Sequence, residues 1–161
     1  MASYFSFKEE LLNKINNVLS KYAAGVSRFA LVYDFGNLDF FPIYLAVLTK
    51  KQEENYRNKM VSDSDFQLLW SPEEFTEYAT KDLSINLSAE AEDFIKNIIE
   101  SQDDYEVSIR EAICSVCFSI NDGLVSSFIY AVDPELADLK ANIGLIKNIP
   151  RKEAVELPSW A

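Results

Sequence analysis

Two apolar runs joined by a short turn signal constrain the fold of this 161-residue chain more than any other feature. The first run spans residues 27–33 and is rich in β-branched and aromatic side chains, and the second spans residues 38–48. Asp34-Phe35-Gly36-Asn37 between them has the composition of a hairpin turn. We therefore expect an antiparallel hairpin, with a bulge or an edge position at Pro42.

Apolar residues at helical spacing predict helices on both sides of this hairpin. Ser6 and Glu9 form a capping box that opens the first helix, and Gly25 marks its end. Ser88 caps a second apolar helix, and Asp103 with Glu106 caps a third. The buried stripes expected on these three helices are Phe7, Leu11, Leu12, Ile15, Val18, Leu19 and Tyr22; Phe94, Ile95, Ile98 and Ile99; and Ile109, Ile113, Val116, Cys117 and Ile120.

The other segments give shorter signals. Residues 50–60 predict a polar, exposed helix, residues 66–70 a third strand, and residues 127–132 a buried strand. Helices are expected to start at Ser71-Pro72-Glu73-Glu74, running to about Thr80, and at Asp133-Pro134, running to about Lys140, with an irregular tail from Ile149. With no repeat and no linker, residues 1–161 are expected to form one α+β domain, whose small, mostly antiparallel sheet of three to five strands is packed by several helices.

Composition narrows the class of protein. With 48% hydrophobic and 13% aromatic residues, the chain has ample material for one core. No signal peptide is visible at residues 1–6, and no apolar stretch is long enough to span a bilayer. Two cysteines do not make a disulfide framework, so we expect a cytoplasmic protein.

Negative charge is concentrated in the middle of the chain. Residues 52–138 carry five basic and twenty acidic side chains, a net charge of −15, whereas the whole chain has a net charge of −11. Such a field repels nucleic acid and anionic membranes and speeds association with basic proteins. Solubility alone is the other interpretation of this acidity.

The sequence lacks the residues that several kinds of catalytic chemistry require. The chain contains no histidine, which removes the commonest general base and metal ligand, and only four glycines, which form no phosphate-binding loop. Cys114-Ser115-Val116-Cys117 matches C-x-x-C, but it falls in the middle of an expected helix, where buried inert thiols are favoured over a redox centre. We expect no enzyme activity, no cofactor and no metal site.

The carboxylates themselves are the candidate binding residues. Acids near Tyr56, Phe66, Trp70, Phe75 and Tyr78 suggest an interface in which aromatic anchors are surrounded by steering charges, although each aromatic alone is more simply a core residue. Acids at helix starts can also have a structural role, because they interact favourably with the helix dipole. The expected partner-binding residues are Asp63, Asp65, Glu73, Glu74, Glu77, Asp103, Asp104 and Glu106.

One segment resembles a known signature. Leu68-Leu69-Trp70-Ser71-Pro72-Glu73-Glu74-Phe75 is similar to the L-R-W-S-P-x-x-W signature of a small bacterial domain family of unknown function. Leu69 stands where that family has arginine, and Phe75 where it has a second tryptophan. Relatives of that kind occur beside polymorphic and contact-dependent growth inhibition toxins, where they resemble immunity proteins.

Charge and resemblance together predict an immunity protein. Its acidic surface would cover a cognate toxin domain that is basic, such as a nuclease, with no nucleic-acid or membrane partner. The alternatives are a DNA mimic that occupies a DNA-binding protein, an acidic adaptor, and a carboxylate- or metal-dependent enzyme, which would need a carboxylate pair in a cleft.

Overall fold

The computed structural model describes residues 3–22, 24–36 and 42–161, which form one α+β domain around a five-stranded mixed sheet. The expected fold class is confirmed. Within these ranges, no helix has the length and apolar character needed to cross a membrane.

The sheet is built on a central antiparallel pair. β1 (Val26–Tyr33) pairs with β2 (Ile43–Thr49), with Tyr33 opposite Ile43. The hairpin strands expected from the sequence are therefore confirmed, although residues 37–41 of the expected turn and second strand lie outside the described residues. Pro42 precedes β2 and lies outside the strand, so no bulge is needed there.

Three further strands complete the sheet in the order β3-β2-β1-β5, with β4 also pairing with β2. β5 (Phe128–Val132) runs parallel to β1, whereas β3 (Glu77–Tyr78) and β4 (Ser84–Ile85) are antiparallel to β2. A parallel pair needs a long crossover, and the chain between β4 and β5 supplies two helices for it.

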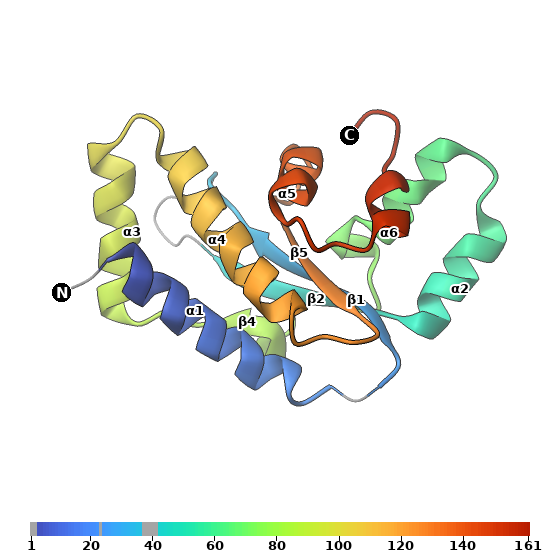
Figure 1. Cartoon of the computed structure of the whole chain (residues 1–161), viewed down its shortest axis with the longest axis horizontal. Coiled ribbons are helices and arrows are strands. Elements are labelled where there is room, and N and C mark those ends of the chain that lie inside the picture. Colours follow the sequence, from blue (N-terminus) through green and yellow to red (C-terminus); the bar gives the residue numbers. More distant parts are fainter. Residues whose placement is uncertain (1–2, 23, 37–41) are drawn as a thin grey trace.

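Helices cover the sheet on both sides (Figure 1). α1 (Tyr4–Leu19), α3 (Ala89–Ser101) and α4 (Tyr105–Asn121) gather on one side, and α2 (Lys50–Lys59) and α6 (Arg151–Val155) on the other. Because successive strand side chains alternate in direction, Phe29 meets Tyr22 on the first side, while Arg28 meets Trp70 on the second. Every residue of β1 and β5 is consequently buried.

Both outer edges of the sheet are occupied. The short strands β3 and β4 pair with the outer side of β2, and the side-chain amides of Asn121 and Asn142 hydrogen-bond to the backbone of β5. Unpaired edges invite pairing with other chains, and this arrangement blocks it.

The helical stripes are largely as expected. Phe7, Leu11, Ile15 and Val18 are buried on α1, and all five expected residues are buried on α4. On α3, Ala91 and Ile95 are buried and the other three stripe residues are partly buried, while α2 buries none, as its polar sequence predicts. Ser88 caps α3 as expected, accepting a hydrogen bond from the backbone N–H of Ala91 at 3.2 Å.

Helix boundaries were less well predicted. Ser3, not Ser6, is the N-cap of α1, and its partner in the capping box is Ser6. Asp104, not Asp103, is the N-cap of α4, and its side chain makes no capping hydrogen bond.

Other local predictions were wrong. Residues expected to form a third strand belong to a 3-10 helix, Asp63–Leu69. The helix expected from Pro72 to Thr80 is a single 3-10 turn, Pro72–Glu74, because Phe75 is buried in the core and Tyr78 pairs with β2. A further 3-10 turn, Lys81–Leu83, leads into β4.

Near the C-terminus, α5 (Leu139–Leu145) begins six residues after Asp133, and the expected irregular tail contains α6. The Asp133 carboxylate instead accepts hydrogen bonds from the backbone N–H groups of Ala137 and Asp138 and so fixes a turn before α5.

Candidate functional site

An acidic hollow lies beyond the carboxyl ends of the two parallel strands. Asp34 directly follows β1 and Asp133 directly follows β5, and parallel pairing brings both to one edge of the sheet. This edge is where ligands bind in many sheets with parallel strands. The acidic hollow has a volume of about 340 Å³ and is lined by Asp34, Phe35, Gly36, Glu106, Asp133, Pro134, Glu135, Ala137 and Asp138.

Short hydrogen bonds fix three of its carboxylates. Asp34 accepts from the backbone N–H of Gly36 at 2.8 Å, and Asp133 accepts from the backbone N–H groups of Ala137 at 3.0 Å and Asp138 at 2.8 Å. Asp138 accepts from the hydroxyl of Tyr33 at 2.8 Å. These acids are therefore held in position before any ligand arrives, and this lowers the entropy that binding would cost.

Among the residues that the structure describes, the lining contains five carboxylates and no lysine or arginine. The nearest compensation is Arg110, whose Nη1 lies 3.3 Å from Asp138 Oδ1. Glu106 and Glu135 are exposed at the rim. The acidic hollow therefore presents a net negative potential to solvent, which suits a lysine or arginine side chain.

Tyr33 is a buried titratable group beneath this site. Burial raises the pKa of Tyr33 above its ordinary value, and its hydroxyl lies between Asp138 and the amide of Asn142, which donates to it at 2.8 Å. The neutral hydroxyl donates to Asp138, so Tyr33 positions a carboxylate and is not placed to exchange protons at neutral pH.

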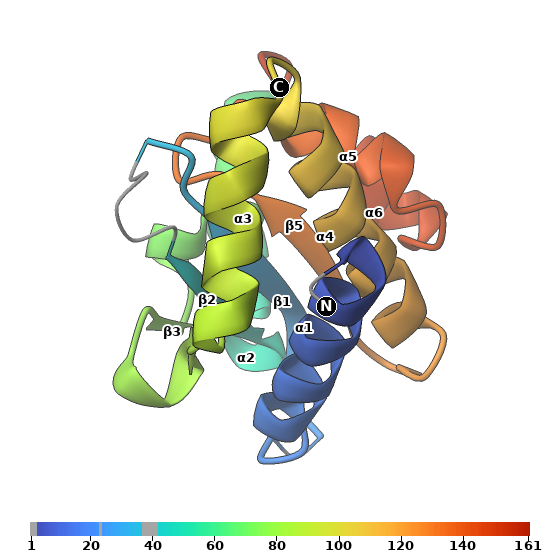
Figure 2. The same cartoon turned by 90° about the vertical axis from the view of Figure 1, so that its left-hand side faces the viewer.

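The structure divides the eight acids expected to bind a partner between two regions. Asp63, Asp65, Glu73, Glu74 and Glu77 lie from the first 3-10 helix to β3, whereas Asp103, Asp104 and Glu106 lie at the turn between α3 and α4. Figure 2 shows this turn and β3 toward opposite ends of the molecule. Only Glu106 lines the acidic hollow.

Asp65 has a local structural role. Its carboxylate accepts hydrogen bonds from the backbone N–H groups of Val61 at 2.8 Å and Ser62 at 3.0 Å, which lower its pKa. The other seven acids of the expected set are exposed.

The tryptophan of the family-like signature belongs to the core. Trp70 is fully buried, and its indole N–H donates to the backbone carbonyl of Glu156 at 2.7 Å. The hydroxyl of Tyr130 donates to the carbonyl of Trp70 at 2.6 Å. Phe75 is buried as well, so the signature connects the sheet to the C-terminal segment and does not present an aromatic anchor on the surface.

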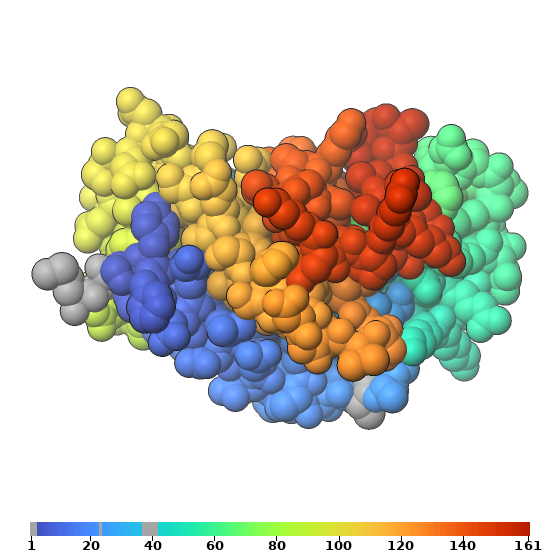
Figure 3. All heavy atoms as spheres, in the orientation of Figure 1, coloured from blue at the N-terminus to red at the C-terminus, as the bar shows by residue number. Residues whose placement is uncertain are grey.

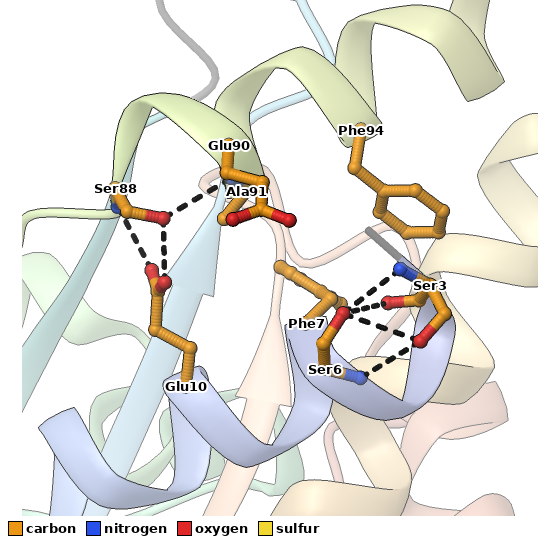
Figure 4. Close-up of a pocket in the computed structure, with 8 residues that line it drawn as sticks. All are labelled: Ser3, Ser6, Phe7, Glu10, Ser88, Glu90, Ala91 and Phe94. Carbon is orange, nitrogen blue, oxygen red and sulfur yellow. Dashed lines mark hydrogen bonds between the residues drawn. The ribbon is translucent and has the colours of Figure 1, made fainter. Parts of the chain in front are cut away.

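A smaller pocket, of about 60 Å³, lies between α1 and α3. Serine and glutamate side chains of its lining hydrogen-bond with neighbouring groups of the same lining (Figure 4). The Glu10 carboxylate accepts from the backbone N–H of Ser88 at 2.8 Å and from its hydroxyl at 2.6 Å. Burial alone would raise the pKa of Glu10, but the hydrogen bonds from Ser88 and the nearby ammonium of Lys14 together outweigh it and lower the pKa. Glu10 thus serves as an acid at the N-terminus of α3.

The two cysteines lie in the middle of α4, and both are buried, as expected from the sequence. Burial raises the pKa of Cys114 to about 12 and that of Cys117 well above its ordinary value. Neither thiol has the exposure of a reactive one, and the charge of Arg110 near Cys114 does not offset the effect of burial.

Four acids of the hollow, Asp34, Asp133, Glu135 and Asp138, were not among the expected site residues. The signal for two of them was an aspartate directly after each of two apolar runs, which indicates a shared site only if the strands are taken as parallel.

Comparison with known proteins identified no relative, so no function can be transferred from one. No protein-family model, no curated protein and no solved structure matches the chain. Within the described part of the chain, no group of three or more Cys, Asp or Glu side chains is arranged to hold a metal ion.

Proposed function

We propose that this protein is an immunity protein that binds a cognate bacterial toxin domain with a basic surface and neutralises it stoichiometrically. The observation that carries the proposal is the acidic hollow, in which five carboxylates converge and the described lining residues include no basic side chain. A lysine or arginine of the toxin that enters the hollow would be paired by acids already held in place.

The distribution of charge supports the same partner. Residues 52–138 have a net charge of −15, and a field of this kind raises the association rate of a basic protein. The exposed acids around β3 and at the α3–α4 turn would steer the toxin toward this protein, while the hollow would fix the orientation of the bound toxin.

The sheet edges favour recognition through side chains over recognition by strand addition. The described edges are taken by β3 and β4 on one side and by the amides of Asn121 and Asn142 on the other. A partner that binds by adding a strand needs a free edge.

The proposal is tested with the product of the adjacent toxin gene. We expect the two proteins to co-purify as a 1:1 complex, and expression of this chain to restore the growth of cells that produce the toxin. Raised salt should slow association more than it speeds dissociation. Failure of growth rescue, with both proteins folded and expressed, would count against an immunity role.

A further inference from the structure

Arg28 is a charged residue inside the core. It lies on β1, is fully buried, and donates from Nη2 to Glu53 at 2.9 Å and to Glu153 at 2.6 Å. Its guanidinium carbon lies 4.7 Å from the ring centre of Trp70 and 4.9 Å from that of Phe128. An arginine that packs against two aromatic rings and has carboxylate partners has the features of a carboxylate receptor.

One of these two carboxylates comes from the end of the chain. Residues 150–161, here called the C-terminal strap, contain α6, which buries no residue of its own. Glu153 reaches Arg28, the Glu156 carboxylate lies 2.7 Å from Arg57 of α2, and the carbonyl of Glu156 accepts from Trp70. Figure 3 shows the strap on the surface beside α2.

Polar contacts therefore provide much of the attachment of this strap. Pro158 is buried, and Ala154, Leu157 and Ala161 pack partly buried against the core, but Val155 and Trp160 remain largely exposed. Segments with few buried apolar contacts open at a lower free energy than the core.

The strap also forms one wall of a second hollow, of about 370 Å³. Glu153 and Pro150 line this hollow together with Ser27, Lys50 and Glu53 on the other side, and residues 125–128 complete the lining. Removal of the strap would join this space to the guanidinium of Arg28.

Charge predicts what such an opened groove would bind. Without Glu153 and Glu156, Arg28, Arg57 and Lys50 would face the single carboxylate of Glu53, so this part of an acidic protein would become cationic. Arginine and tryptophan are also the side chains most enriched at the energetic centres of protein interfaces.

We propose that Arg28, Arg57 and Trp70 form a binding site for a glutamate side chain on a peptide segment of a partner, and that the C-terminal strap occupies this site in the free protein. Glu153 is the internal ligand, and an incoming carboxylate displaces it. This site is separate from the acidic hollow in position and opposite in charge, so it does not depend on the proposed immunity function.

Competition between the strap and a copy of itself tests the site in the full-length chain. The probe is a fluorescent peptide with the sequence of residues 149–161. We expect it to bind the Glu153→Gln variant at least about tenfold more tightly than the wild type, because the internal competitor is weakened. Lys152→Gln, an exposed change of one charge on the same helix, should bind like the wild type.

Specificity for the carboxylate provides a second test of the proposed site. A peptide in which the glutamate corresponding to Glu153 is replaced by glutamine should lose this binding. Equal binding of both peptides, or no binding to folded Glu153→Gln protein, would overturn the proposal.

Hydrogen exchange of the wild-type chain tests the opening without any substitution. Amides of residues 151–156 should exchange through an opening that leaves β1 and β5 protected. If they exchange only when the whole domain unfolds, the strap is not displaceable and the proposal fails.

Discussion

The side chain of Asn121 pairs with the backbone of Ile129 as a neighbouring strand would. Its Nδ2 donates to the Ile129 carbonyl at 2.9 Å, and its Oδ1 accepts from the Ile129 N–H at 2.7 Å. Both groups are buried, at the edge of β5 that faces away from β1. One amide at the end of α4 thereby satisfies a donor and an acceptor that would otherwise lack partners.

Replacing Asn121 by alanine should destabilise the domain strongly. Two buried backbone groups lose their partners, at about 1–3 kcal/mol each, so we expect a loss of roughly 2–4 kcal/mol in the free energy of unfolding. Urea denaturation followed by circular dichroism measures it. Asn97→Ala, the same change at an exposed position of α3, should alter stability by less than about 0.5 kcal/mol. Similar losses in both variants would contradict this role for Asn121.

The sequence predicted the elements that carry a strong local pattern. The strands around residues 27–33 and 127–132, and the buried faces of α1 and α4, follow from periodicity because those side chains face one core. The helix expected after Ser71-Pro72 did not form, since burial of Phe75 and pairing of Tyr78 with β2 outweigh a good helix start.

The acidic hollow was only partly predictable. Glu106 was expected from its place at a helix start, but Asp34 and Asp133 lie about 100 residues apart in the sequence and meet only because β5 is parallel to β1. The direction of a strand depends on the path of its connection, and the residues of the strand do not encode it. The structural role of Arg28 was missed for a related reason, since its carboxylate partners come from α2 and α6.

Charge reversal at the rim of the acidic hollow should weaken toxin binding if the proposed function is correct. We expect Glu135→Lys to slow association by about tenfold at low salt and to reduce the dependence of the rate on salt, because a steering charge changes sign. Biolayer interferometry against the immobilised toxin domain measures both effects. Glu9→Lys, an equal change at an exposed position of α1 outside the hollow and outside both acidic regions, is the control. Equal effects of the two substitutions would indicate general attraction without a binding role for the hollow.

The thiols should be inert in the native protein. With its pKa raised to about 12, only about one Cys114 thiol in ten thousand is a thiolate at pH 8, and the thiolate is the reactive form. Iodoacetamide should therefore label neither cysteine over an hour at pH 8, whereas urea-unfolded chain should be labelled at both. Intact mass spectrometry counts the adducts. Fast labelling of native Cys114 would contradict this interpretation.

Arg28→Ala should destabilise the domain more than Arg57→Ala does. Loss of Arg28 removes the closest cation from Glu53 and Glu153 and leaves them only the longer contacts to Arg57, at 3.7 and 3.5 Å, so we expect a cost of about 3–5 kcal/mol for the broken buried pair. Arg57 is about a quarter exposed, and truncation there should cost roughly 1 kcal/mol. Chemical denaturation at pH 7 measures both. A smaller effect at Arg28 would mean that the guanidinium is not the centre of this network.

Glu10 should make part of the stability of the domain depend on pH. Because the hydrogen bonds from Ser88 and the charge of Lys14 together lower its pKa in the folded protein below the ordinary value of 4.5, the folded state favours the ionised carboxylate. The resulting stabilisation is present above pH 4.5 and is lost as the pH falls through the lowered pKa. We therefore expect Glu10→Gln to lower the urea midpoint at pH 7, and the difference from the wild type to shrink toward pH 3.

Glu9→Gln, the same substitution at the exposed neighbouring position, should leave the midpoint nearly unchanged at both pH values. A Glu10→Gln deficit that stays constant between pH 7 and pH 3 would show that packing, and not the charge on Glu10, links α1 to α3.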